Sequence, residues 1–199
     1  MQATAMAELF DDDLLQKLAA SRRELLDEYL RPHSHPWIIG YSGGKDSTLV
    51  VHLVMEMLMA LPRSERVRQV HIVANDTLVE SPLVVGHIKA TMARFDEAAS
   101  ALRLPVETRI TAPKLDHRFW VNLIGRGYPA PSRSFRWCTD RMKIQPTSDD
   151  IKAQASQTGE VILLLGVRRE ESAAWTMCHI GVSRASPFRR RRRAHWSAG

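Results

Sequence analysis

The sequence predicts an α/β fold built on a doubly wound parallel sheet. Four short apolar runs, at residues 37–41, 67–74, 106–111 and 161–165, are bounded by turn residues. Between them lie longer segments in which apolar residues recur at helical spacing. A glycine-rich turn joins the first run to the first of these segments. Strands that alternate with helices are typical of parallel sheets, because each helix crosses a face of the sheet to reach the next strand.

Residues 1–35 are expected to form an N-terminal helical segment. Leucines recur among charged residues at roughly helical spacing between residues 6 and 30, and Pro32 and Pro36 end the pattern. We expect one or two amphipathic helices that pack on the sheet. The chain of 199 residues favours one main domain. We place that domain at residues 36–174 and treat residues 175–199 as an arginine-rich tail.

The first predicted strand leads through a short loop into a helix at 48–61, which Pro62 ends. The loop reads Ser42-Gly43-Gly44-Lys45-Asp46-Ser47. Its glycines permit positive φ and close approach of a ligand, its serines offer hydroxyl donors, and its lysine adds positive charge. A strand, loop and helix in this order aim backbone N–H groups at an anion. Asp46 suits a Mg²⁺ ion that travels with a nucleotide, or a helix cap. A glycine turn without a ligand is the simpler alternative.

Polar residues follow the second predicted strand as Asn75-Asp76-Thr77. Ligands of parallel sheets bind outside the carboxyl ends of the strands. We therefore expect Asp76 and Thr77 to lie near the loop at 42–47. The alternative is that Asn75 and Asp76 only form a turn.

A helix at 83–102 leads to the third predicted strand, and an irregular segment at 113–133 follows that strand. In and just after this segment, aromatic residues alternate with arginines: Phe119, Trp120 and Tyr128 with Arg118, Arg126, Arg133 and Arg136. This composition suits stacking on bases and pairing with phosphates. It suits equally well a hydrophobic plug with exposed arginines.

Cys138 lies between basic residues, with Arg136 before it and Arg141 and Lys143 after it. Nearby positive charge favours the thiolate form of a cysteine, which is the nucleophile and the metal ligand. A lone cysteine can also be a small buried apolar residue. The flanking charges leave these two interpretations evenly balanced.

A helix at 146–157, ended by Gly159, leads to the fourth predicted strand. Arg168, Glu171 and Ser172 follow the carboxyl end of that strand, so we expect them on the same rim as the loop at 42–47. The alternative is a solvated run of charges.

The formal net charge of +6 equals the six arginines of residues 181–199, a stretch without an acidic residue. A charge argument for nucleic-acid binding therefore rests on that terminal run. No stretch is long and apolar enough to cross a membrane, and residues 1–22 lack the basic start of a signal peptide. The two cysteines, Cys138 and Cys178, make no disulfide framework. We expect a cytoplasmic protein that does not bind membranes.

The loop at 42–47 resembles the SGGxDS PP-loop of the ATP pyrophosphatases, a group that includes phosphoadenosine-phosphosulfate (PAPS) reductases, tRNA thiolation enzymes and GMP synthetase. Stretches at 76–82, 119–131 and 135–141 resemble the DndC family of bacterial DNA phosphorothioation proteins. The stretch at 166–172 is similar to a motif shared more widely by PAPS reductase-like proteins. The resemblance covers residues 14–174 and implies a sheet of the adenine nucleotide α-hydrolase-like (PP-loop) type.

The DndC resemblance implies that ATP, with Mg²⁺, is cleaved to AMP and pyrophosphate to activate a DNA backbone oxygen, which sulfur then replaces. It implies DNA, a cysteine desulfurase and other Dnd proteins as partners. It also implies site roles. The loop at 42–47 holds the ATP pyrophosphate, with Lys45 and Asp46 catalytic, Asp76 lies by the nucleotide, Cys138 binds a [4Fe–4S] cluster or handles sulfur, and Arg168, Glu171 and Ser172 form the substrate-side motif.

The resemblance ends before the tail, and family members are longer and carry further cysteines. A [4Fe–4S] cluster needs about four cysteine ligands, and this chain has two. We therefore expect a truncated or frameshifted copy, with the cluster held only in full-length relatives. The alternatives are a PAPS or APS reductase and an inactive nucleotide- or DNA-binding fragment. The C-terminal Glu-Cys-Gly-Leu-His motif of those reductases is missing from the sequence, as are the paired C-x-x-C cysteines of tRNA thiolation enzymes.

Overall fold

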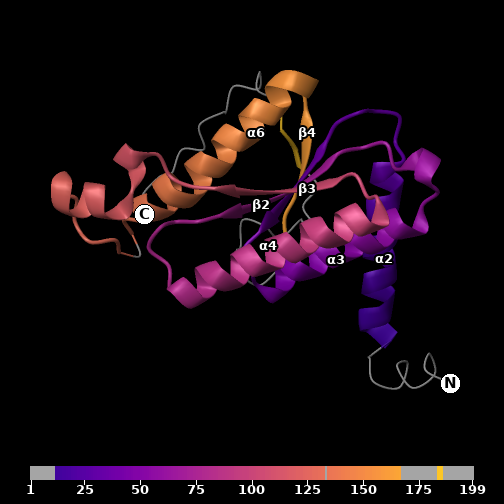
Figure 1. Ribbon diagram of the computed structural model, residues 1–199, viewed down its shortest axis with the longest axis horizontal. Helices are drawn as coiled ribbons and strands as arrows, with labels where there is room; N and C mark the ends of the chain where they lie inside the picture. Colours follow the sequence, from indigo (N-terminus) through magenta and orange to yellow (C-terminus); the bar gives the residue numbers. More distant parts are fainter. Residues whose placement is uncertain (1–11, 133, 167–182, 186–199) are drawn as a thin grey trace.

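The computed structural model describes residues 12–132, 134–166 and 183–185 (Figure 1). A helix, α2 (Asp12–Tyr29), precedes the sheet. The chain then forms β1 (Trp37–Tyr41), α3 (Lys45–Ala60), β2 (Val70–Asn75), α4 (Pro82–Leu102), β3 (Val106–Thr111), α6 (Gln145–Thr158), β4 (Val161–Leu164) and β5 (Ser183–Ala185). Within these described residues, no helix is both long and apolar enough to span a bilayer.

The sheet has the strand order β3-β2-β1-β4-β5. The first four of these strands are parallel, and Trp37 of β1 pairs with Val70 on one side and with Ile162 on the other. The predicted doubly wound parallel sheet is therefore confirmed. One difference is β5, which lies within the predicted tail and runs antiparallel to β4.

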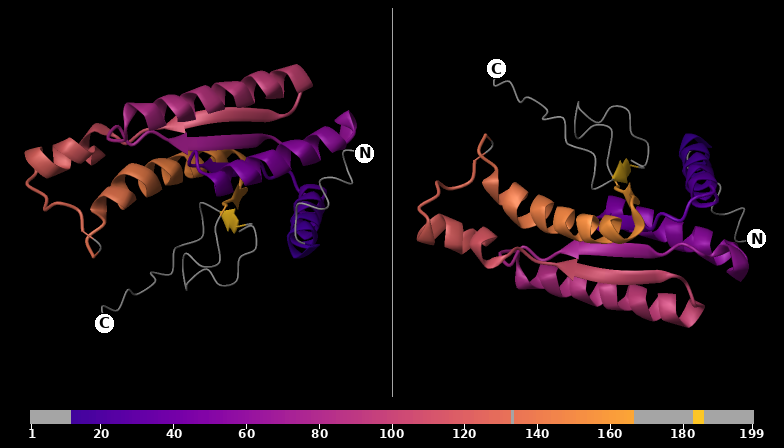
Figure 2. Two further views of the ribbon diagram at one scale, coloured as in Figure 1. Left: turned by 90° about the horizontal axis from the view of Figure 1, so that it is seen from below. Right: turned by 90° about the horizontal axis from the view of Figure 1, so that it is seen from above.

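Helices cover both faces of the sheet, as Figure 2 shows. Ile39 of β1 and Ile72 of β2 pack in the large core with α3 and α4. Ile38 and Val73, the alternate residues of the same strands, pack against Ala155 of α6 on the other face. Because successive side chains of a strand point to opposite faces, a strand that is buried on both sides has a continuous apolar sequence. This explains the apolar runs in the sequence.

The α2 helix reaches the core mainly through its last turns. Leu25 and Tyr29 are buried, and the Tyr29 ring packs edge-on against Trp37. Leu14 and Leu15 in the first turns are exposed. A helix thus spans residues 12–29 of this segment, and it packs chiefly against α3. Residues 1–11 lie outside the described part of the chain.

The largest differences from the predicted elements are the starts of α3 and β2 and the structure of the segment at 113–133. The α3 helix begins at Lys45 instead of residue 48, because Gly44 is its N-cap and the end of the loop already has helical geometry. The β2 strand begins at Val70 instead of residue 67, since Val67 follows a 3₁₀ turn and is exposed, and it extends to Asn75. The segment at 113–133 is not simply irregular, because it contains a 3₁₀ turn and a π-helix, Val121–Gly125.

The strand order changes direction between β1 and β4, because the chain runs outward from β1 through β2 to β3 and then returns to β4 on the other side. In an open α/β sheet, ligands bind at such a switch point, outside the carboxyl ends of the strands. The loop after β1 and the segment after β4 meet at this position.

Candidate functional site

The loop after β1 has the backbone geometry that its glycines predict. Gly43 has a φ of +75°, in the left-handed region that other residues rarely adopt. A side chain at Gly43 would also meet Ile88 of α4 at 3.1 Å. Gly44 caps α3 without a side-chain hydrogen bond. The first amides of a helix have no acceptor within the helix, so the first turn of α3 can donate them to a ligand in front of the loop.

The Ser47 hydroxyl holds the loop together from inside. Its oxygen accepts a hydrogen bond from the Ser42 amide at 3.2 Å and donates one to the Gly44 carbonyl at 2.9 Å. Ser47 is buried, whereas Ser42 and Lys45 are exposed. Ser47 thus positions the loop, while the Ser42 hydroxyl and the Lys45 ammonium group are the side chains that can reach a ligand.

The end of β4 approaches this loop so closely that only glycine fits. A Cβ atom on Gly166 would lie 2.6 Å from the Asp46 carbonyl oxygen and 3.0 Å from the Ser47 amide nitrogen. A Cβ atom on Gly40 of β1 would lie 2.7 Å from Leu165. The candidate site is therefore bounded by two backbones, the loop at 42–47 and the segment after β4. Sequence analysis did not assign roles to Gly40 and Gly166. The signal was a glycine within or directly after an apolar run, which often marks close backbone approach.

The end of β2 supplies the polar group that was expected there. The Asp76 carboxylate is 12% exposed, accepts a hydrogen bond from the Leu78 amide at 2.9 Å, and lies 3.6 Å from the Lys89 ammonium group. Ile88, which borders Gly43, also lines a small cavity with Asp76. The structure thus places Asp76 across Ile88 from the loop, at the same edge of the sheet.

Thr77 is 1% exposed, and its hydroxyl has no hydrogen-bond partner among the described residues. Buried hydroxyls are nearly always hydrogen-bonded. An unsatisfied donor at the carboxyl end of β2 is consistent with a bound polar ligand at this edge.

Hydrogen bonds join the carboxyl ends of β2 and β3 to α6. The Asn75 amide nitrogen donates to the Thr147 hydroxyl at 2.9 Å, and the Thr111 hydroxyl donates to the Asn75 side-chain oxygen. On the solvent side, a hydrogen bond to Asp149 raises the pKa of Lys114. Residues 113–144 lie between β3 and α6, and we call them the insertion. These bonds hold the insertion beside the candidate site.

Cys138 lies in this insertion, in a short helical turn (α5, Trp137–Thr139), and its thiol is free and half-buried. Two of its basic neighbours bind elsewhere. Arg141 donates to the Asn122 side-chain oxygen at 3.1 Å and to the Tyr128 hydroxyl at 2.8 Å, and Lys143 pairs with Glu80 at 3.2 Å. The Glu80 carboxylate therefore offsets the charge of Lys143, whereas Arg141 binds neutral groups and, like the exposed Arg136, keeps its positive charge.

The described residues do not fit a [4Fe–4S] cluster. Cys138 is the one cysteine in this part of the chain, and no group of three or more His, Cys, Asp or Glu side chains there is placed to hold a metal. Arg168, Glu171 and Ser172, together with Cys178, lie outside the described residues. The structure brings the loop and Asp76 to one edge and leaves the predicted substrate-side motif undescribed.

The phosphoadenosine phosphosulfate reductase domain family matches residues 36–180 of the chain. No curated protein matches it. Among solved structures, the chain is similar to the U34-tRNA thiolase NcsA of Methanococcus maripaludis, determined with its [4Fe–4S] cluster. The identity is 16% and the TM-score 0.42, with 75% of this chain and 45% of that chain covered. The chain thus spans less than half the length of that structure.

Proposed function

Because the chain belongs to the phosphoadenosine phosphosulfate reductase domain family, whose members transfer sulfur, we propose that it is the sulfurtransferase component of DNA phosphorothioation. In this proposal it uses ATP to activate a DNA backbone oxygen for replacement by sulfur. The observation that carries the proposal is the loop at 42–47, which presents glycine backbone, an exposed lysine and a helix N-terminus at the switch point of the sheet.

Several features of the site support ATP phosphates as its ligand. The positive φ of Gly43 and the close approach of Gly166 leave backbone, not side chains, on two sides of the loop. The first amides of α3 and the Lys45 ammonium group supply hydrogen-bond donors and positive charge. We assign Asp46 to the Mg²⁺ ion that accompanies the nucleotide, since carboxylate oxygens are the ligands Mg²⁺ prefers.

The proposed chemistry has two substitutions. The DNA phosphate oxygen attacks the α-phosphorus of ATP, and the bond to the leaving pyrophosphate breaks. A sulfur nucleophile then attacks the activated DNA phosphorus, and AMP leaves with the former DNA oxygen. The chain contributes to the first step by stabilising the charge that develops on pyrophosphate, through Lys45 and the α3 amides. Cys138 would carry this sulfur as a persulfide, loaded by a cysteine desulfurase together with other Dnd proteins in the cytoplasm. Its outer sulfur attacks the phosphorus, and an external thiol reductant then cleaves the S–S bond, which releases the phosphorothioate and restores the Cys138 thiol. No step is assigned to an iron–sulfur cluster.

A PAPS or APS reductase-like activity is the second candidate, because the family match supports it equally. The two functions differ in their products. The proposed enzyme releases pyrophosphate from ATP, whereas a reductase releases sulfite from an activated sulfate.

The test measures both products from one preparation, with ATP, Mg²⁺ and DNA in one assay and with PAPS and a thiol reductant in the other. Pyrophosphate without sulfite supports the proposal, and sulfite would overturn it. A Cys138→Ser variant separates the two substitutions. We expect it to keep pyrophosphate release and to lose phosphorothioate in DNA when the desulfurase and Dnd partners are present. Full sulfur incorporation by this variant would remove Cys138 from the mechanism.

A further inference from the structure

The insertion at 113–144 contains aromatic residues that pack against one another and aromatic residues that are exposed. Phe119 stacks on Trp137 at 5.5 Å between ring centroids, and Tyr128 packs edge-on against Trp137 at 5.4 Å. The Trp137 ring nitrogen donates to the Pro129 carbonyl, and the Arg141 guanidinium lies over the Tyr128 ring. These residues form a small internal core, so the plug alternative holds for this part of the insertion.

Trp120 and Phe135 lie outside that core. Trp120 is 57% exposed and Phe135 is 45% exposed. The Trp120 ring rests edge-on against Phe119, and a hydrogen bond from the Phe135 amide to the Ser132 hydroxyl holds the turn before Trp137. The Trp120 ring is thus supported by a neighbouring ring and the Phe135 backbone by a hydrogen bond, which lowers the conformational entropy that a ligand would have to overcome.

The stacked core brings two matching segments together. Phe119 has Arg118 before it and Trp120 after it, while Trp137 follows Phe135 and Arg136. Each segment therefore carries one exposed aromatic ring and one exposed arginine, and the Phe119–Trp137 stack places the two segments side by side. We call Arg118, Trp120, Phe135 and Arg136 the aromatic–arginine set.

The positive charges of Arg118 and Arg136 are available to a ligand. Among the described residues, neither Arg118 nor Arg136 makes an ion pair, whereas Arg109 of β3 and Arg141 of the insertion are bound to other side chains. The acidic residues of the insertion, Asp116 and Asp140, contact His117 and Gln145. In both views of Figure 2 the insertion projects beyond the carboxyl ends of β2 and β3, the edge at which the candidate site lies.

We propose that the aromatic–arginine set binds single-stranded DNA as the acceptor strand. Trp120 and Phe135 stack on unpaired bases, and Arg118 and Arg136 pair with the backbone phosphates. Exposed aromatic rings and arginines in combination are the usual means of binding single strands without sequence preference. A duplex offers no free base faces to such rings except at its ends. This inference rests on the proposed function for the choice of DNA. It adds that the DNA strand is unpaired, and it names the residues that hold it.

The experiment measures fluorescence anisotropy of a labelled oligodeoxythymidylate with the full-length chain. Arg189 to Arg193 are replaced by glutamine throughout, to reduce binding by the tail. We expect Trp120→Ala and Phe135→Ala each to weaken binding by about 5- to 100-fold. Arg118→Gln and Arg136→Gln should each lower the slope of log affinity against log salt by about 0.7.

The matched controls are Val67→Ala and Arg63→Gln, exposed residues in the segment before β2, which should bind like the parent chain. Trp120→Phe should restore most of the affinity if stacking is responsible. Unchanged binding by folded Trp120→Ala and Phe135→Ala proteins would overturn the inference, as would tighter binding of the matching duplex or of the equivalent oligouridylate. Pyrophosphate release is assayed on the same preparations. If that activity is missing while the aromatic variants still lose DNA affinity, the proposed function fails and the binding surface stands.

Discussion

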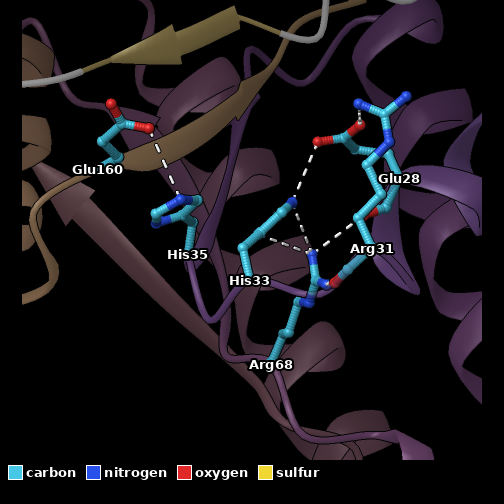
Figure 3. A network of polar contacts seen from close by, with 6 residues as sticks. All are labelled: Glu28, Arg31, His33, His35, Arg68 and Glu160. Atoms are coloured by element: carbon cyan, nitrogen blue, oxygen red, sulfur yellow. Dashed lines mark hydrogen bonds and ion pairs between the residues drawn. The ribbon is translucent and has the colours of Figure 1, made fainter.

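At the amino edge of the sheet, polar side chains bind one another, whereas in the loop at the carboxyl end of β1 the Lys45 side chain faces solvent. Figure 3 shows Arg68, which precedes β2 and is 4% exposed, donating to the Glu28 carbonyl at 3.0 Å and to the Arg31 carbonyl. The His33 ring contacts both the Arg68 guanidinium and the Glu28 carboxylate. At the opposite edge, Lys45 and Ser42 are exposed beside a helix N-terminus.

The polar network at the amino edge links the end of α2 to the segments that precede β1, β2 and β4. The Tyr29 hydroxyl at the end of α2 bonds to both the amide and the carbonyl of Arg68, and His35 before β1 lies 3.6 Å from Glu160 before β4. A polar group that is paired inside the protein contributes to stability and cannot bind a ligand, while an unpaired one at the surface contributes little to stability. The comparison predicts that changes at the amino edge alter stability and that changes at the carboxyl edge alter ATP binding.

The largest effect is expected for Arg68→Met. This change leaves the Glu28 and Arg31 backbone carbonyls without their charged donor, while the Glu28 carboxylate keeps its ion pair with Arg31. We expect the free energy of unfolding in urea to fall by about 2 to 4 kcal/mol, because each of the two carbonyls loses a hydrogen bond from a charged donor. Arg63→Met, an exposed arginine close by, should change it by less than about 0.5 kcal/mol. Equal losses in the two variants would show that the network has no special role.

The next effect is expected for Lys45→Ala, at the carboxyl edge. The change removes a charged donor from the proposed phosphate site, so we expect the dissociation constant of ATP, measured by calorimetry, to rise about 10- to 100-fold. The free energy of unfolding should change by less than about 0.5 kcal/mol, because the side chain is exposed. The control is Lys152→Ala on α6, also exposed, which should bind ATP normally. Normal ATP affinity in Lys45→Ala would exclude the loop as the phosphate site.

Gly166→Ala tests both stability and ATP binding, because Gly166 lies in a close backbone contact that also borders the proposed ATP site. Its added methyl group would meet the Asp46 carbonyl, which is backbone and cannot turn aside. We expect a loss of about 1 to 3 kcal/mol in unfolding free energy, typical of overpacking, together with weaker ATP binding. In contrast, Gly86→Ala in α4 meets no atom within 4 Å, so it should stabilise the protein by up to about 1 kcal/mol. A Gly166→Ala protein as stable as the parent would show that the two backbones can separate.

The smallest effect is a pH dependence of stability. Burial, followed by the nearby Arg68 charge, lowers the pKa of His33 below its usual 6.5, and burial, followed by Arg109, lowers the pKa of His71. The unfolded chain therefore takes up protons at a higher pH than the folded chain does. The stability from the neutral rings is fully present above about pH 6.5 and falls as the pH drops toward the lowered values.

Urea unfolding between about pH 7.5 and about pH 5 measures this dependence. His33→Gln should flatten the profile, and His52→Gln should leave it unchanged, because the His52 ring is largely exposed. A profile that keeps its full slope in His33→Gln would assign the effect to other groups. The pH effect should appear in stability and not in ATP affinity at the opposite edge.

The sequence by itself determined the helix and strand ends, and the loop, that are set by residues adjacent in the sequence. The bounds of β1 and β3 were predicted to the residue, and α4 within one residue, because apolar runs, Pro82 and Pro105 mark those ends locally. The loop at 42–47 was identified in the same way, since its glycines and its position between strand and helix are contiguous. The role of each loop residue remains a prediction.

Only the tertiary structure decided which side chains are buried and which backbones meet. Arg68 and Lys45 are both basic residues near a strand end, yet the end of α2 and the segment after it bury the first, while Lys45 stays exposed. Trp137 became core while Trp120 stayed exposed, because Phe119 stacks on Trp137 from a segment far away in the sequence. Gly166 must be glycine because β4 returns beside β1. Burial and close backbone approach arise from contacts between residues that are distant in the sequence. Local sequence patterns do not specify which distant residues meet.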